Sequence, residues 1–505
     1  MKRVSKNLTK AVTLSVLLML PYGMAWAETY TDVISGANDE YTDEIKKYDE
    51  DTNTYIYDFS KDDDAKLDVT ATESYDRAIS VKDSSIKIKG QLDVTVRADK
   101  EGGRYGYFPY STVSLSGNNL LFDRRDGGTI TQIDGDDSAV RIYGQGNAIY
   151  LGNGNIEQTI NNDSSPINDV SGIEIYGGNN QGNNNLIVYG EDTIKTTAKQ
   201  NETIASVGYN RISGVEIDIN ASDNNKIILG YKGNYDDLDE FNQENIAEKV
   251  KQLGAVTIDL TAENTCQDNN REAKVIGIRN AADNGNIIAG VITKASGYTI
   301  KDDDDSISAA GVYMSGMENN NIIAANKFMI TAEAESKSDG MVSAMGIVNT
   351  AVNDKNTINY VNAFGDGSDI TATATGNMLT VNGISAYEAQ AMKIIDGYGR
   401  EYIIYSKNGD VEVNTGAIDI TTTTNNGTDI ENIGIRANGG TVNINGDAGI
   451  KVYVNNAADT NSDVFGIWSN LGGTVNVEGA ANITINDNRL DAKKNSCSCR
   501  YARFG

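Results

Sequence analysis

The sequence contains no histidine among its 505 residues. Histidine supplies the base of Ser-His-Asp and Cys-His mechanisms and is a frequent zinc ligand, so these mechanisms and every imidazole metal site are excluded. Residues 365–369 (GDGSD) have the composition of a serine-protease nucleophile loop, but Ser368 has no base to activate it. We therefore predict no catalytic residue, no metal site and no cofactor.

Acidic side chains are the remaining candidates for chemistry. The densest run covers residues 302–305, and residues 61–64 (KDDD) form a shorter one. Carboxylates can hold calcium, but neither run has the Gly-Gly-x-Gly-x-Asp spacing of calcium-binding repeats, so solvated corners are the better interpretation. Paired carboxylates beside an Arg or Lys could also cleave a polysaccharide. The sequence offers many Asp residues and no way to choose such a pair.

An aromatic stretch offers a binding surface. Tyr105, Tyr107, Phe108 and Tyr110 lie in an expected insertion at residues 101–128. Exposed aromatic rings can stack on sugars, which makes these four residues candidate ligand contacts. The alternative is that the rings pack near the first repeats or belong to a simple surface insertion.

The N-terminus has the three parts of a secretory signal peptide. Residues 1–10 carry four positive side chains, residues 11–20 are apolar, and Ala25 and Ala27 form a small-x-small cleavage site. The apolar stretch is too short to span a bilayer comfortably, so we expect cleavage after Ala27. The rest of the chain should then be exported without a transmembrane helix.

Composition restricts the partners. The formal net charge of −28 repels nucleic acid and anionic membranes. Only Cys266, Cys497 and Cys499 are present, so we expect no disulfide framework. The low count of three prolines permits long backbone hydrogen-bond ladders. These features predict an acidic exported protein that binds no nucleic acid.

A small residue followed by Ile or Val recurs along the chain. Subtracting successive residue numbers gives intervals of 61, 33, 42, 63, 34, 35, 37, 51 and 32 residues. Most lie near the mid-thirties, and the long ones should contain insertions or a missed degenerate repeat. The pairs are Ala78-Ile79, Ala139-Val140, Gly172-Ile173, Gly214-Val215, Gly277-Ile278, Gly311-Val312, Gly346-Ile347, Gly383-Ile384, Gly434-Ile435 and Gly466-Ile467.

Residues 343–381 show how one unit is built. Three runs of alternating apolar and polar residues are separated by Asn, Gly and Asp. We expect Met345 and Ile347 to share one face of a first strand, Tyr360 to lie on a second strand and Ile370 on a third. One such coil cannot bury its apolar residues alone, whereas stacked coils bury them in a continuous column. Asn suits the corners, because it tolerates left-handed backbone and can hydrogen-bond along the stack.

The pattern predicts an all-β protein, a parallel β-helix or solenoid with a short helical insertion. The helix is expected at residues 236–254, capped by Asp236 or Asp237 and ended by Gly254, lying across the stack. It could also dock a partner. The expected regions are the signal peptide at 1–27, an N-terminal region and cap at 28–75, repeats at 76–490 with insertions near 101–128 and 236–254, and an atypical basic tail at 491–505. The tail is interpreted as a frameshift or truncation.

In its Ala25-Trp26-Ala27 signal, its long Asn/Gly/Thr repeats, its scarce cysteine and its acidic balance, the chain resembles the passengers of type V secreted autotransporters. The resemblance covers roughly residues 28–490. It implies a right-handed parallel β-helix threaded through a C-terminal outer-membrane barrel. It also implies adhesion or aggregation at the surface of a bacterium with an outer membrane. The implied barrel strands do not follow the repeats in this chain.

The expected function is therefore non-enzymatic adhesion or self-association. Its partners would be host or bacterial surface glycans, surface proteins or a second copy of the chain. The expected location is secreted or at the cell surface, or the periplasm where the barrel is truly missing. A polysaccharide lyase or hydrolase and a structural surface spacer are the alternative functions.

Overall fold

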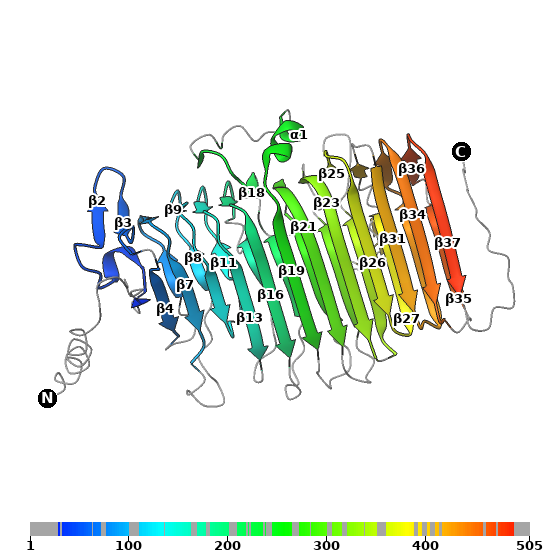
Figure 1. Ribbon diagram of the computed structural model, residues 1–505, viewed down its shortest axis with the longest axis horizontal. Coiled ribbons are helices and arrows are strands. Elements are labelled where there is room, and N and C mark those ends of the chain that lie inside the picture. The colour runs from blue at the N-terminus through cyan, green and yellow to red at the C-terminus, as the bar shows by residue number, and fades with distance from the viewer. Residues whose placement is uncertain are drawn as a thin grey trace, which may run out of the picture.

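The computed structural model is a parallel β-helix with one short helix on its side, which confirms the predicted fold class (Figure 1). Strands that follow one another along the chain are stacked from the N-terminal to the C-terminal end (Figure 1). The structure describes residues 29–488 except 31–32, 63, 72–76, 100–110, 136, 163–168, 178–181, 201–209, 219–220, 222–223, 236–237, 239–244, 265–271, 283, 300–305, 316–320, 338, 351–359, 388–391, 396–400, 405–409, 414–416, 458–460 and 471–472.

Each coil contributes strands at three positions, the first two in a 24-stranded sheet and the third in an 11-stranded sheet. The first-position strands are β3 (Thr54–Asp58), β6 (Ser85–Lys89), β9 (Leu121–Arg124), β12 (Ala148–Leu151), β15 (Leu186–Tyr189), β18 (Asn225–Leu229), β25 (Tyr360–Ala363), β30 (Asp410–Val413), β33 (Thr441–Ile444) and β36 (Thr474–Val477). The second-position strands are β1 (Thr29–Tyr30), β4 (Lys66–Thr70), β7 (Asp93–Arg97), β10 (Ile130–Ile133), β13 (Ile156–Asn162), β16 (Asp192–Gln200), β19 (Val256–Asn264), β26 (Ser368–Thr375), β31 (Ala417–Asn425), β34 (Asp447–Asn455) and β37 (Ala481–Asn488). Two longer strands run through both positions, β21 (Gly285–Thr299) and β23 (Ile322–Ser336).

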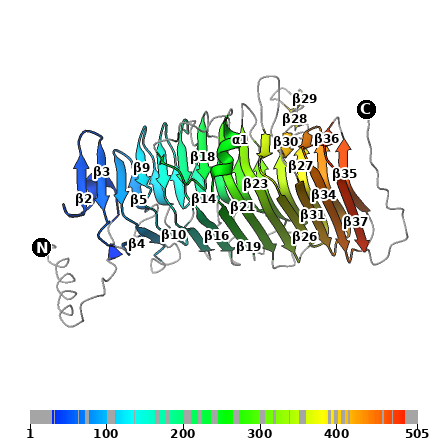
Figure 2. The same ribbon diagram turned by 45° about the horizontal axis from the view of Figure 1, so that its top comes forward.

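The third-position strands are β5 (Arg77–Val81), β8 (Ser111–Leu115), β11 (Val140–Ile142), β14 (Val170–Ile175), β17 (Asn210–Ile217), β20 (Glu272–Asn280), β22 (Ser306–Met314), β24 (Met341–Asn349), β27 (Met378–Tyr387), β32 (Asp429–Asn438) and β35 (Asn461–Asn470). Among the described residues, two antiparallel pairings lie outside this pattern: β2 (Lys46–Asp49) with β3, and β28 (Met392–Ile395) with β29 (Glu401–Ile404). Figure 2 shows β28 and β29 projecting beyond the coils. Helical turns in the described part include η2 (Gly36–Asn38), α1 (Ile246–Lys249) and η6 (Val250–Gln252).

Inward side chains form columns along the axis. Val140, Ile173, Val215 and Ile278 occupy one register position on successive coils, and all four are fully buried. Parallel strands lie about 4.8 Å apart, so each of these side chains contacts its equivalents above and below. Burial of such a side chain contributes about 1.5–3 kcal/mol, which only stacking can supply.

The expectation that Met345 and Ile347 share a face is wrong. Ala344 and Ile347 are fully buried, whereas Met345 is half-buried on the outer face. The alternation changes phase at Gly346, which faces inward as Ile347 does. A Cβ at Gly346 would lie closer than 3.0 Å to Cγ2 of Ile370 on the facing sheet. The small residue of each repeat is therefore required by close packing between the sheets.

Tyr360 lies on the second strand of that unit, β25, and Ile370 on the third, β26, as expected. Tyr360 lies on the outer face of β25, while Val361 fills the interior. A run of only four residues carries too short an alternation to fix its phase from sequence. Ile370, Ala372 and Ala374 on β26 are buried.

The long intervals between repeat pairs contain either a missed repeat or an insertion, as expected. The 61-residue interval hides a coil, because Val113 of β8 pairs with Ile79 on one side and Val140 on the other. The 63-residue interval contains the insertion that carries α1, and the 51-residue interval contains the β28–β29 hairpin. The aligned columns therefore continue through all three.

A buried asparagine ladder fixes one corner of the stack. The backbone N–H of Asn147 donates to Oδ1 of Asn185 (3.1 Å), and the N–H of Asn185 donates to Oδ1 of Asn225 (3.1 Å). Nδ2 of Asn185 donates to the Gly144 carbonyl (3.0 Å). These bonds satisfy backbone groups at a buried turn, and they confirm the hydrogen bonding of Asn along the axis that the sequence predicts.

The two described ends of the stack differ. Near the N-terminus, Tyr41 packs with its ring centroid 5.9 Å from Tyr30 and 5.4 Å from Tyr57. β3 and β4 already pair in parallel with β6 and β7, so coils begin before residue 76. At the other end, β37 is largely exposed, with Ile483 at 39%.

Within the expected 236–254 helix, the described residues are helical at Leu238 and in α1 and η6. The proposed caps Asp236 and Asp237 lie outside the described residues. The apolar stripe is nevertheless buried: Ile246 and Val250 pack in one cluster with Ile228 on the outer face of the sheet. Across the described ranges, no helix is long and apolar enough to cross a membrane.

Candidate functional site

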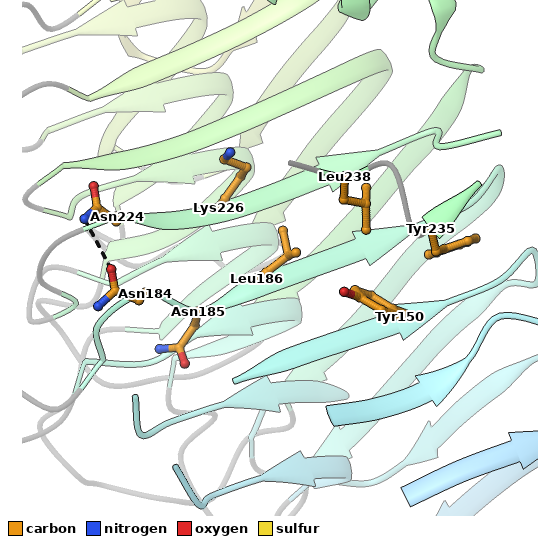
Figure 3. A pocket seen from close by; sticks show the side chains of 8 residues that line it. All are labelled: Tyr150, Asn184, Asn185, Leu186, Asn224, Lys226, Tyr235 and Leu238. Atoms are coloured by element: carbon orange, nitrogen blue, oxygen red, sulfur yellow. Dashed lines mark hydrogen bonds between the residues drawn. The ribbon is translucent and has the colours of Figure 1, made fainter. Parts of the chain in front are cut away.

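A polar hollow of about 440 Å³ lies on the outer face of β12, β15 and β18, where the insertion joins the coils (Figure 3). We call it the tyrosine groove. Its lining residues are Tyr150, Asn184, Asn185, Leu186, Asn224, Lys226, Tyr235 and Leu238. The groove is therefore shared between the repeats and the inserted segment.

Strand alternation positions the floor of the groove. Ile149, Ile187 and Ile227 point into the core, so the neighbouring Leu186 and Lys226 point outward on adjacent coils. The insertion is held in place by apolar contacts of Leu238, Ile246 and Val250 with the sheet. The core columns thus dictate which side chains the repeats contribute to the groove.

Two tyrosines form its aromatic wall. The rings of Tyr150 and Tyr235 lie 5.5 Å apart at 49°, and Tyr231 meets Tyr235 edge-on at 5.2 Å. The Arg125 guanidinium lies 5.6 Å from the Tyr150 ring centre and 5.4 Å from that of Tyr235, and its Nε donates to Asp123 (2.9 Å). Contacts of this kind contribute about 0.5–1.5 kcal/mol each, so they hold the wall in one geometry.

Tyr235 is also held by its hydroxyl, which donates to the Leu151 carbonyl at 2.9 Å. Burial is the main cause that raises the pKa of Tyr235 to about 12, opposed by the charge of Arg125. The ring is therefore neutral at physiological pH. A neutral, fixed aromatic face is suited to stacking against the apolar face of a sugar.

The opposite wall is polar. Nδ2 of Asn224 donates to Oδ1 of Asn184 at 3.2 Å, as Figure 3 shows. Both residues are exposed, with φ of 54° at Asn184 and 59° at Asn224. Lys226 adds a cation on the floor. The lining thus combines aromatic rings, primary amides and an ammonium group.

A second cluster lies on the 11-stranded sheet. Arg141, Glu174, Glu216 and Arg279 occupy one register position on four successive strands, and we call them the charged ladder. Glu216 accepts hydrogen bonds from Arg211 (2.9 Å) and from Arg279. All four side chains of the ladder are largely buried, at 11% exposure or less. Adjacent coils thus bring together carboxylates that are far apart in sequence.

The two carboxylates of the ladder differ in acidity. Burial raises the pKa of Glu174 to about 8, although Arg141 opposes the shift. Burial acts on Glu216 as well, but Arg279 and Arg211 outweigh it and hold the pKa of Glu216 below its usual value. Environments that separate two neighbouring acids in this way are typical of acid–base pairs.

Serine side chains of neighbouring coils donate hydrogen bonds to the two ladder carboxylates. Ser138 Oγ donates to Glu174 (2.6 Å), and Ser171 Oγ donates to Glu216 (3.2 Å). The Arg141 guanidinium lies 3.9 Å from the ring centre of Tyr176. This arrangement ties successive coils to one another. In the described ranges, no three His, Cys, Asp or Glu side chains are placed to hold a metal ion.

Most candidate residues from the sequence are not among the residues that the structure describes. Ala25, Ala27 and the aromatic residues Tyr105, Tyr107, Phe108 and Tyr110 fall outside the described residues, as do residues 302–305 and the three cysteines. Ser368 is buried, and its Oγ accepts a hydrogen bond from the Phe328 N–H (3.2 Å). Ser368 therefore joins one coil to the next.

Sequence reasoning missed the tyrosine groove and the charged ladder. Each needs the register between coils, which aligns residues tens of positions apart. The available signal was polar or aromatic residues at outward positions of three consecutive repeats. Comparisons with protein-family models, curated proteins and solved structures found no match to this chain.

Proposed function

We propose that this chain is an exported, non-enzymatic β-helical adhesin that binds surface glycans through the tyrosine groove. The observation that carries the proposal is the fixed pair of Tyr150 and Tyr235 facing exposed asparagine amides across one hollow. Sugars present both an apolar ring face and hydroxyl groups, so they fit one aromatic and one amide wall. The resemblance to autotransporter passengers supports a secreted or cell-surface location.

The expected affinity of one site is modest. A few net hydrogen bonds of about 0.5–1.5 kcal/mol and a stacking contact of similar size must offset the entropy of binding. Display of many copies on a surface raises the overall avidity without any new contact. Adhesion is therefore a suitable use of this groove.

The test is binding of the full chain to immobilised glycans, compared with the variants Tyr150→Ala and Tyr235→Ala. Loss of one stacking face should weaken binding about threefold to tenfold. Tyr453→Ala is the matched control, because Tyr453 is a half-buried outward tyrosine of β34, outside the groove. Sedimentation of the same samples detects self-association. Glycan binding that is unaffected by both groove variants would overturn the proposal.

A second candidate function is cleavage of an acidic polysaccharide. The observation that favours it is the carboxylate pair Glu174 and Glu216, on adjacent strands with shifted pKa values and flanking arginines. Release of reducing or unsaturated ends, lost in Glu174→Gln and kept in Tyr235→Ala, would support it. Absence of turnover across a polysaccharide panel retires it. If the chain neither binds glycans nor cleaves polysaccharides, a structural surface spacer is the remaining function.

A further inference from the structure

Outward asparagines continue along the stack beyond the tyrosine groove, exposed at Asn184 and Asn224 and half-buried at Asn284. Asn184, Asn224 and Asn284 precede β15, β18 and β21 at equivalent register positions, and we call them the asparagine track. Nδ2 of Asn284 donates to Oδ1 of Asn224 (3.0 Å), as Asn224 does to Asn184. The first two line the groove, and Asn284 is one coil further along.

The amides of the track keep a common orientation. All three residues have left-handed backbone, with φ of 54°, 59° and 64°, so their side chains leave equivalent turns. A primary amide has two N–H donors and an acceptor oxygen with two lone pairs. The bonds along the track use one donor and one lone pair of Asn224, which leaves one of each for a ligand.

From the groove, the asparagine track extends toward β21 and not toward β12. On the other side of Asn184 the equivalent position is Gly146, also left-handed at φ 66°, which has no amide side chain. Three amides at strand spacing span roughly 10 Å parallel to the axis. This length exceeds one sugar ring, and it leads away from the groove toward β21.

We infer that the groove binds an extended polysaccharide chain laid along the β-helix axis, with Asn284 as a contact for sugars beyond the groove. The inference rests on the proposed glycan-binding function and names its ligand class, a polymer. The tyrosine wall fixes one sugar, and successive hydroxyl groups meet Asn224 and Asn284. A longer ligand therefore gains contacts that a short one cannot reach.

The test is calorimetric binding of the full chain to two size series, malto-oligosaccharides and hyaluronan fragments, each of two, four and six sugars. Wild-type affinity should rise with length in the series that binds. Asn284→Gly keeps the left-handed turn and removes the amide, so it should weaken the six-sugar ligand about threefold to tenfold. The two-sugar ligand should change by less than about twofold.

Asn426→Gly is the matched control, because Asn426 is exposed and left-handed (φ 67°) at the distant turn between β31 and β32. It should leave all affinities unchanged. Equal effects of Asn284→Gly on short and long ligands, or affinity independent of length, overturn the inference and leave the glycan-binding function standing. Absence of binding in both series overturns both.

Discussion

The close approach of the two sheets can be tested at Gly311. A Cβ at this position would lie closer than 3.0 Å to Cγ2 of Ile330, and 2.9 Å from the Gly346 carbonyl oxygen. Ile330 is only 3% exposed and Gly346 O is backbone, so neither can give way easily. Gly311→Ala is therefore a small-to-large change in a closed space.

The magnitude follows from two opposing effects. Overpacking costs about 1–3 kcal/mol, whereas replacing Gly by Ala stabilises by about 0.4–1 kcal/mol through the unfolded chain. We expect a net destabilisation of about 1–2 kcal/mol at Gly311. Gly466 makes the equivalent approach to Ile483, which is 39% exposed and can rotate away. Gly466→Ala should therefore be nearly neutral.

Repeat proteins do not unfold in one step, so the assay is hydrogen exchange by mass spectrometry, read strand by strand and supported by urea midpoints. Gly311→Ala should lower protection in β22 and β23. Ile330→Ala added to it removes Cγ2 and should cost at least about 1 kcal/mol less than the sum of the single variants. Equal effects at Gly311 and Gly466, or strict additivity with Ile330→Ala, would refute the reasoning.

Three further predictions concern the core, the charged ladder and the buried asparagines. Ile347→Asp places an unpaired charge in the core column and should destabilise the protein by roughly several kcal/mol. Hydrogen-exchange protection should be lost first in the strands next to β24, whereas Met345→Asp should have only a mild effect. Uniform loss of protection along the chain would contradict this prediction. The pKa of Glu174 is raised from 4.5 to about 8, so between these pH values the folded state binds more protons than the unfolded chain. The free energy of unfolding should therefore fall as the pH rises from 4.5 to about 8. If Glu174→Gln leaves this pH dependence unchanged, the assignment to Glu174 is wrong. Asn185→Ala leaves buried backbone groups without partners and should cost about 1–3 kcal/mol in urea melts, compared with little for Asn184→Gly.

Sequence periodicity predicted the fold because each coil of a solenoid packs only against the coils next to it in the chain. Every unit must bury alternate residues, and a Gly or Ala before Ile or Val marks ten of the eleven third-position strands, with Thr112 in that place on β8. The sequence is a poorer guide to which alternate residues of a strand face the core. At Gly346 two consecutive residues face inward, and this reverses the assignment of Met345. A period of two cannot reveal such a change without knowledge of the facing Ile370.

The tyrosine groove was beyond reach for another reason. Tyr235 comes from an insertion, and its hydroxyl bonds to Leu151, 84 positions earlier in the chain. Tyr150 looks like any outward residue of a short strand. Only the folded stack shows that the insertion returns to the outer face of β12 and places the two rings together.

Function in this fold therefore depends on register as much as on residue type. The core columns fix which side of each strand is exposed, but they tolerate a slip by two residues with little loss of burial. The buried ladder of Asn147, Asn185 and Asn225 does not, because each side chain bonds to the backbone of one particular neighbour. These bonds align Leu186 with Lys226 and bring Asn184 beside Asn224. The asparagines that looked purely structural in the sequence are thus the reason that the exposed amides and the tyrosine wall meet in one groove.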